Sequence, residues 1–293
     1  MPDLPASPAA ARSYLYVPGD RADRLAKAAS RGADALIVDL EDSVARAAKD
    51  QARRTTREWL ARQRPGGPAQ LWLRINPDLA DADIGAVSAA VTGVVVPKAE
   101  PGLLAVIDGL LAGREQALGL DPGLLAVQPL IETAAGLLEV AAVAGAPRVA
   151  RLGIGEADLA AELGLRPGPA REELAPIRLQ VVIASAARGI AAPVGPTATD
   201  FRDLGALRTT SEALLRLGFR ARTAIHPAQL PVINEVFTPS AAEVDRARAL
   251  VAALEQAERA GTGVTVAEDG TMLDVAVVRS AREVLARARG SNG

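Results

Sequence analysis

Short apolar runs alternate with helix-length segments along most of the chain. Runs rich in Leu, Ile and Val predict strands at residues 13–17, 35–40, 71–76, 93–98, 125–132, 149–155, 192–195 and 223–226. The stretches between them predict helices at residues 22–31, 44–63, 81–90, 103–119, 134–144, 174–189, 210–217 and 228–237. Strand and helix therefore alternate from residue 13 to residue 237.

Several of the predicted strands are apolar on both faces, including residues 36–38 and 94–96. This pattern is typical of parallel strands that are covered by helices. Eight strand–helix units in about 230 residues match a closed (β/α)8 TIM barrel better than an open doubly wound sheet. We therefore predict an α/β fold. The barrel domain spans residues 1–237 and includes a short disordered N-terminus at residues 1–11.

The pattern changes after Phe237. A long helix at residues 242–260 is followed by a Gly-rich turn, two short β-like pieces at 264–267 and 271–273, and a last helix. We interpret residues 238–293 as a C-terminal helical and β-hairpin extension. It is expected either to cap the barrel or to reach a neighbouring subunit.

The composition excludes several classes of function. Aromatic residues make up 2% of the chain and the net charge is −2, which disfavours base stacking and electrostatic binding of nucleic acid or anionic membranes. The absence of cysteine excludes disulfides, thiolate nucleophiles, zinc–thiolate sites and iron–sulfur clusters. No secretory signal or apolar membrane-length segment is found, so we expect a soluble, cytoplasmic protein with a small-molecule ligand.

Polar side chains gather at the carboxyl ends of the predicted strands, where barrels of this kind build their active sites. They are Asp39, Glu41, Asp42, Arg74, Asn76, Lys98, Glu132, Glu156, Asp158 and His226. Carboxylates dominate this set, and their mutual repulsion is best relieved by a hard divalent cation with oxygen ligands. The sequence therefore predicts Mg²⁺ at this end of the barrel.

Glu132 and Asp158 are the leading metal ligands. They follow the fifth and sixth predicted strands, whose ends lie about 5 Å apart in a sheet. Either acid could instead cap the helix that follows it. A dinucleotide fingerprint at Gly153 and Gly155 fails, because Asp158 stands where Gly or Ala is needed.

Three basic residues keep two interpretations each. Arg74 suits a substrate carboxylate, because its planar guanidinium can bind two oxygens, but an ion pair with Asp39 or Glu41 is the alternative. His226, the only histidine, suits a hydrogen-bonded structural role or a base. Lys98 suits a Schiff base or a simple charge at the rim.

Distinctive motifs lie along nearly the whole chain. They are RSYLYVPGDR at 12–21, GADALIVDLEDS at 32–43, LRIN at 73–76, VPK at 96–98, PLIET at 129–133, GEADLAAELG at 155–164 and AIHPAQ at 224–229. Together they resemble the CitE-like branch of the HpcH/HpaI aldolase superfamily, which includes citrate lyase β subunits, malyl-CoA lyases and citramalyl-CoA lyases.

The resemblance implies a (β/α)8 barrel with Mg²⁺ on Glu132 and Asp158, and a substrate-carboxylate role for Arg74. For Glu41 and Asp42 it implies hydrogen bonds to metal-bound water, while orienting Arg74 or capping the next helix remain alternatives.

The resemblance also extends to the tail, where residues 270–274 are similar to a segment whose aspartate crosses a subunit interface. Asp274 is thereby implied as the catalytic acid/base in a homo-oligomer such as a trimer. The alternative is that Asp274 is the N-cap of the last helix.

The implied activity is Mg²⁺-dependent carbon–carbon bond cleavage. A β-hydroxyacyl-CoA such as citryl-, malyl- or citramalyl-CoA would give acetyl-CoA and a 2-oxo acid. Three alternatives stay open: a citrate lyase β subunit acting on a citryl-acyl carrier, a metal-dependent pyruvate aldolase, and a non-catalytic barrel that binds CoA esters.

Overall fold

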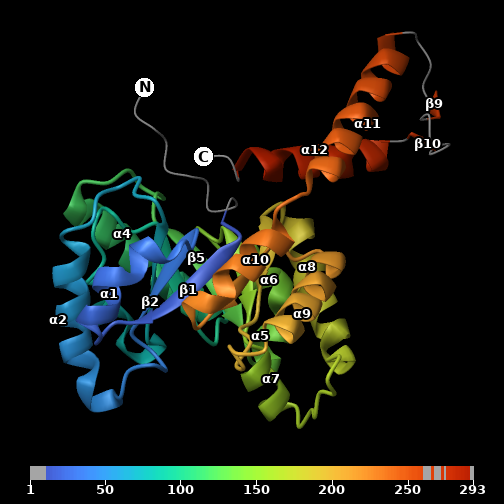
Figure 1. Ribbon diagram of the computed structural model, residues 1–293. Coiled ribbons are helices and arrows are strands. Elements are labelled where there is room, and N and C mark those ends of the chain that lie inside the picture. The colour runs from blue at the N-terminus through green and yellow to red at the C-terminus, as the bar shows by residue number, and fades with distance from the viewer. Residues whose placement is uncertain (1–10, 260–264, 267–271, 274, 291–293) are drawn as a thin grey trace. The chain divides into compact units, whose positions relative to one another are not determined.

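The structure is a computed structural model that describes residues 11–259, 265–266, 272–273 and 275–290. The chain divides into two units, residues 1–235 and residues 236–293 (Figure 1). Each unit is described by itself below.

Parallel strands close into a barrel in the first unit. The described residues contribute eight of them, in the order β1 to β8, with β1 pairing with both β2 and β8. Their bounds are β1 Ser13–Pro18, β2 Ala35–Asp39, β3 Gln70–Arg74, β4 Gly93–Val96, β5 Ala126–Ile131, β6 Arg151–Ile154, β7 Ala191–Gly195 and β8 Ala221–Ala224. The predicted (β/α)8 TIM barrel is confirmed.

Helices connect consecutive strands and lie outside them (Figure 1). The α-helices of this unit are α1 Ala22–Ala28, α2 Lys49–Leu60, α3 Ala80–Ile84, α4 Pro101–Leu118, α5 Ala134–Leu138, α6 Val140–Ala144, α7 Glu156–Glu162, α8 Ala175–Arg188, α9 Leu204–Leu217 and α10 Leu230–Phe237, whose last residues belong to the second unit. Short 3-10 turns occur at η2 Ala29–Arg31, η3 Arg46–Ala48, η4 Pro77–Leu79, η5 Glu172–Leu174 and η6 Pro227–Gln229. Helix α7 was not predicted from the sequence.

The helix predicted from residue 44 begins only at Lys49. The chain first turns around the Asp39 carboxylate, which accepts hydrogen bonds from the backbone of Glu41 and Ser43. The Lys49 ammonium then closes the loop by donating to the carbonyls of Leu40 and Glu41. These bonds compete with helical geometry and delay the helix by several residues.

The barrel interior is filled mainly by aliphatic side chains, with Tyr14 and Trp72 as its large aromatic members. Their rings pack with centroids 6.3 Å apart. The scarcity of aromatic residues is therefore offset by placing these two at the centre of the core. Ala11, assigned to the disordered N-terminus by the prediction, is buried, and its carbonyl accepts from Arg151.

The second unit contains α11 Ala241–Arg259, the antiparallel pair β9 Thr265–Val266 and β10 Met272–Leu273, and α12 Val275–Gly290. Within it α11 and α12 pack together, burying Ala247, Leu254, Val278 and Ala281. Asp274 lies outside the described residues, as do residues 1–10. Across the described chain, no helix combines the length and apolar character needed to cross a membrane.

Candidate metal and carboxylate site

A cavity of about 440 Å³ lies at the carboxyl ends of the barrel strands. Residues at the end of a strand, or in the loop that follows it, line the cavity for every barrel strand except β4. Arg74, Glu132 and Asp158 line it together, as the sequence predicted for residues that share this end of the barrel.

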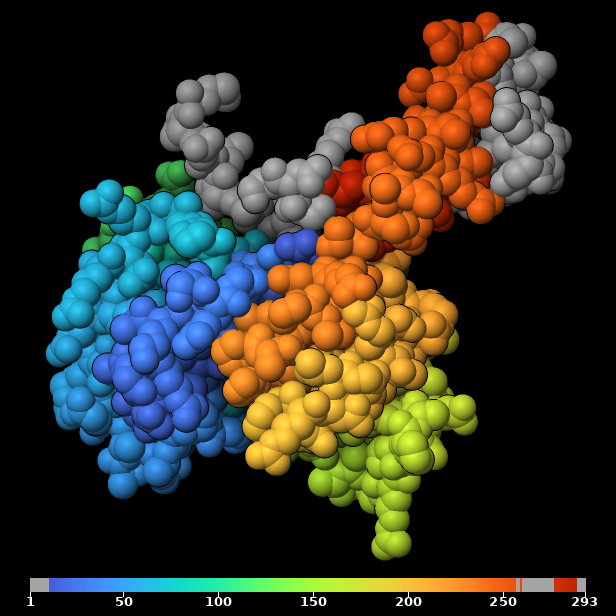
Figure 2. Space-filling view, viewed as in Figure 1, coloured from blue at the N-terminus to red at the C-terminus, as the bar shows by residue number. Residues whose placement is uncertain are grey.

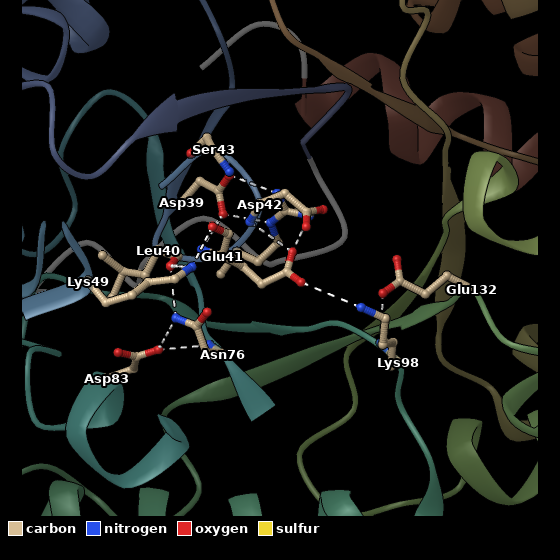
Figure 3. Close-up of polar contacts among 11 residues, drawn as sticks. Asp39, Leu40, Glu41, Asp42, Ser43, Lys49, Asn76, Asp83, Lys98 and Glu132 are labelled. Atoms are coloured by element: carbon tan, nitrogen blue, oxygen red, sulfur yellow. Dashed lines mark hydrogen bonds and ion pairs between the residues drawn. The ribbon is translucent and has the colours of Figure 1, made fainter. Parts of the chain in front are cut away.

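Glu132 follows β5 and is held by its neighbours on both sides. Its Oε1 accepts a hydrogen bond of 2.9 Å from the backbone nitrogen of Lys98 (Figure 3). Lys98 adopts a left-handed conformation, with φ 48°, to present this nitrogen. On the other side, a Cβ at Gly155 would lie 2.6 Å from both Cβ and Oε2 of Glu132. Glycine at 155 is therefore needed to leave room for the carboxylate.

The electrostatics around Glu132 disfavour its charge. Burial raises the pKa of Glu132 to about 7, and the nearby carboxylates of Asp158 and Glu41 add to the effect, which the Lys98 hydrogen bond only partly opposes. No described lysine or arginine forms an ion pair with the carboxylate of Glu132 or Asp158. A bound cation would supply the missing positive charge.

The donor set fits Mg²⁺. Asp158 stands in the first turn of α7 with an exposed side chain that lines the cavity. Within the described residues no group of three or more His, Cys, Asp or Glu side chains could hold a metal. One or two carboxylates with several retained waters is the coordination that Mg²⁺ prefers, whereas a structural zinc site needs four protein ligands.

Arg74 lies in a cluster of carboxylates. Its guanidinium makes two 2.7 Å hydrogen bonds to Asp39, an ion pair of 3.0 Å with Glu41 and one of 3.3 Å with Asp42. Burial disfavours the cation, but these partners, above all Asp39, raise the pKa of Arg74. The ion pair that the sequence left as an alternative is thus present. Arg74 also lines the cavity, and its binding of a substrate carboxylate remains a prediction.

Glu41 links the arginine cluster to Glu132. Its Oε2 contacts Arg74, while its Oε1 lies 3.7 Å from the Lys98 ammonium, as Figure 3 shows. Burial raises the pKa of Glu41, which Arg74 and Lys98 partly counteract. Asp42 is more exposed and forms the longest of the Arg74 ion pairs. Both acids therefore orient Arg74; contact with metal-bound water stays a prediction.

His226 has a structural contact that explains it. Its Nδ1 accepts from the backbone nitrogen of Ala228, and its ring stacks on Phe201 with centroids 4.5 Å apart. His226 caps the turn η6 and lines a second cavity, of about 310 Å³, beside β1. That second cavity is also lined by Arg24, Lys27 and Arg31, a basic cluster that the sequence analysis did not single out.

Glu156 also lines the cavity, but an arginine binds its carboxylate. It is buried, and Arg178 of α8 binds it through two hydrogen bonds of 2.5 and 2.9 Å. The sequence alone does not predict this pair or the position of Arg171 at the cavity. Both depend on how α7, α8 and the segment between them fold together. Of the acids named for the strand ends, Glu132 and Asp158 are those left without a cationic partner among the described side chains.

The fold and the cavity define a class of protein: a (β/α)8 barrel whose fifth and sixth strands are followed by two carboxylates suited to a divalent cation. The profile of the family described as HpcH/HpaI aldolase/citrate lyase matches residues 12–227. The chain belongs to this family, which confirms the resemblance seen in the motifs.

Relatives and solved structures cover nearly the whole chain. It is 36% identical over 281 residues to a (3S)-malyl-CoA thioesterase of Cereibacter sphaeroides, covering 94% of each protein. It is 32% identical over 308 residues to an L-malyl-CoA/β-methylmalyl-CoA lyase of Rhodobacter capsulatus, again covering 94% of each. The crystal structure of CitE from Mycobacterium tuberculosis with magnesium, acetoacetate and coenzyme A superposes with a TM-score of 0.75 and 31% identity, covering 96% of this chain and 99% of that one.

Proposed function

We propose that this protein is a Mg²⁺-dependent lyase that cleaves, or forms, a β-hydroxyacyl-CoA, with acetyl-CoA and a 2-oxo acid as the other side of the reaction. The observation that carries the proposal is the pair Glu132 and Asp158, two carboxylates without cationic partners among the described side chains, in the same cavity as Arg74. A malyl-CoA lyase relative and a CitE structure with magnesium and coenzyme A support it.

Cleavage breaks the bond between the carbinol carbon and the carbon next to the thioester. The hydroxyl loses its proton and becomes the carbonyl of the 2-oxo acid, while the electron pair of the broken bond passes to the acetyl carbon, which gains a proton. Mg²⁺ held by Glu132 and Asp158 would supply a Lewis acid that stabilises negative charge on substrate oxygen. Arg74 would bind the substrate carboxylate in exchange for Asp42, its longest and most exposed ion-pair partner.

Asp274 would exchange the proton at the acetyl carbon, contributing on the order of 10²–10⁴ in rate as a positioned acid/base. This role rests on the resemblance of residues 270–274, and it includes delivery to the site of a neighbouring subunit in a homo-oligomer such as a trimer. The basic cluster Arg24, Lys27 and Arg31 of the second cavity supports an anionic carrier such as coenzyme A, whose phosphates these side chains can bind.

The test is a mass-spectrometric assay of malyl-, citramalyl- and citryl-CoA with and without Mg²⁺. We expect acetyl-CoA and the matching 2-oxo acid to form only with Mg²⁺, and Glu132→Ala to lose the reaction while keeping its circular dichroism spectrum. Turnover that persists in a chelator would contradict the metal role. Turnover of a citryl-acyl carrier or of pyruvate with an aldehyde, but of no CoA ester, would instead favour the carrier-dependent or aldolase alternative.

A second candidate is hydrolysis of malyl-CoA, which the similarity to a (3S)-malyl-CoA thioesterase favours. The same assay separates the two reactions, because hydrolysis yields malate and free coenzyme A whereas cleavage yields glyoxylate and acetyl-CoA. Binding of CoA esters without any product would identify a non-catalytic barrel.

A further inference from the structure

Arginines gather around the buried carboxylate of Glu156 on the β6 side of the cavity. The buried carboxylate of Glu156 is already bound by both arms of Arg178, yet the guanidinium of Arg171 also lies 3.9 Å from it. Arg222, buried nearby on β8, donates only to backbone carbonyls and hydroxyls in the contacts that the structure describes. In this group of three arginines, Arg178 and Arg171 therefore share the carboxylate of Glu156, while Arg222 is bound by neutral acceptors.

Arg171 is the member of this group that lines the cavity. Its side chain is 34% exposed, whereas that of Arg178 is 6% exposed. Its backbone lies in the left-handed region, with φ 55°, at the entry to the turn η5. The segment between α7 and α8, yellow-green in Figure 2, protrudes from the surface of the barrel unit. Arg171 is thus a cation that solvent and ligands can reach. Its carboxylate partner, Glu156, already accepts two hydrogen bonds from Arg178.

The same cavity is also lined by neutral hydrogen-bond donors. Thr197 and Thr199, in the segment after β7, line the cavity together with Arg171. An arginine beside hydroxyl groups is a suitable environment for a carboxylate. Arg74 is the last residue of β3, and β4 and β5 separate that strand from β6 in the barrel order. The cavity therefore has a cation on each side of Glu132 and Asp158.

We infer that Arg171 binds a second substrate carboxylate, so that the site favours a β-hydroxyacyl thioester whose carbinol carbon carries a carboxymethyl group, as in citryl-CoA. Malyl-CoA carries hydrogen and citramalyl-CoA carries methyl at this position, and neither would engage Arg171. The inference rests on the proposed function for the identity of the thioester. It concerns specificity, since Arg171 touches the substituent and none of the reacting atoms.

The experiment compares the binding of oxaloacetate and pyruvate by calorimetry in the presence of Mg²⁺, because these two oxo acids differ by the second carboxylate alone. We expect the wild-type protein to bind oxaloacetate more tightly. Arg171→Gln should lower the affinity for oxaloacetate by about 10- to 100-fold, which is the range expected for one charge-assisted hydrogen-bond pair. It should lower the affinity for pyruvate by less than about threefold. Arg171→Lys should restore much of the oxaloacetate affinity.

Arg166→Gln is the matched control, because Arg166 is an exposed arginine of the same segment and lines neither cavity described above. It should change neither affinity. Equal losses for both oxo acids in Arg171→Gln would show a structural role and overturn the inference. Unchanged affinities in Arg171→Gln would also overturn it. The same holds if the wild-type protein binds neither oxo acid or binds pyruvate more tightly than oxaloacetate.

The kinetic counterpart is the ratio of kcat/KM for citryl-CoA to that for citramalyl-CoA, which Arg171→Gln should lower by a similar factor. Failure here is distinguishable from failure of the proposed function. If no CoA ester is cleaved, the lyase proposal fails while the calorimetric comparison still decides the role of Arg171. If the esters are cleaved with an unchanged ratio, the lyase proposal stands and the inference about Arg171 fails.

Discussion

The surroundings of Glu132 fix its position and disfavour its negative charge. The backbone nitrogen of Lys98 fixes one oxygen, and Gly155 leaves space for the other. Burial and the charges of Asp158 and Glu41 nevertheless raise its pKa to about 7. Position is therefore set by the fold, while the charge balance is left to be completed by a ligand.

This pKa predicts how stability depends on pH when metal is absent. Glu132 has a pKa of about 7 in the folded protein against an ordinary value of 4.5, so the folded state holds more protons between these values. The free energy of unfolding should therefore fall as pH rises from about 4.5 through 7. In denaturant titrations with a chelator, wild type and Glu132→Gln should be similar near pH 5. Wild type should be less stable near pH 8, by on the order of 2 kcal/mol.

Excess Mg²⁺ should reverse the sign of the difference near pH 8, because the wild-type site then gains a ligand that Glu132→Gln binds poorly. A difference between the two proteins that stays constant from pH 5 to pH 8 would show that the carboxylate keeps its ordinary pKa.

At the scale of elements, the site depends on how closely the ends of β5 and β6 approach. Gly155, directly after β6, contacts the side chain of Glu132, directly after β5. Asp158 follows three residues later in α7, so the same junction sets the separation of both carboxylates. Adding a methyl group at Gly155 would therefore disturb the proposed metal site by moving Glu132, without changing any charge.

Gly155→Ala should displace Glu132, since its Cβ would lie 2.6 Å from two atoms of that side chain. We expect Mg²⁺ affinity, measured by calorimetry, to fall by about 10-fold or more, and the free energy of unfolding to fall by about 1–3 kcal/mol. Gly113→Ala in α4 is the control, because a Cβ there meets nothing within 4 Å. It should leave Mg²⁺ affinity unchanged and raise stability by up to about 1 kcal/mol. Equal metal affinities in all three proteins would contradict the proposed ligand.

The strands could be predicted from the sequence because parallel strands covered on both faces read as unbroken apolar runs. The predicted strand ends then indicated Glu132 and Asp158 as candidate metal ligands, and both line the cavity at those ends. Helix α7 could not be predicted, since its seven residues, EADLAAE, are too short and too alanine-rich to show a clear period.

The ion cluster of Arg74 illustrates the same limit. Asp39 and Arg74 are partners in the register of β2 with β3, so their contact follows only once that register is known. The sequence shows that both residues end strands, and it leaves open whether Arg74 faces a protein carboxylate or a substrate. The pairing of Glu156 with Arg178, 22 residues away, likewise depends on the packing of α7 against α8.

At the scale of the whole molecule, the proposed reaction uses residues from both the barrel and the C-terminal extension. The barrel carries Glu132, and the proposed acid/base Asp274 lies in the second unit of the chain. Delivery of Asp274 to a neighbouring subunit would make each active site a product of two chains, so that isolated protomers would lack turnover while keeping their oxo-acid site.

Mixing two inactive variants tests this arrangement. Glu132→Ala and Asp274→Asn, co-expressed in equal amounts and purified together without selection for mixed oligomers, should recover about one quarter of wild-type turnover. This fraction follows because random assembly pairs an intact Glu132 with a neighbour's intact Asp274 in half of a half of the sites. Each variant alone should stay inactive. No recovery in mixed oligomers would show that Asp274 acts within its own chain, and full activity of Asp274→Asn would remove it from the mechanism.

The barrel assigns different tasks to different connections. The proposed metal carboxylates follow β5 and β6, and Lys98 and Gly155 fix that of Glu132. Arg171, Thr197 and Thr199 lie in segments beyond β6 and β7. Evolution can therefore retune which substituent is accepted by altering those outer segments, without disturbing the part that would stabilise developing charge. Such an architecture allows relatives to diverge in substrate preference while the reactive centre stays the same.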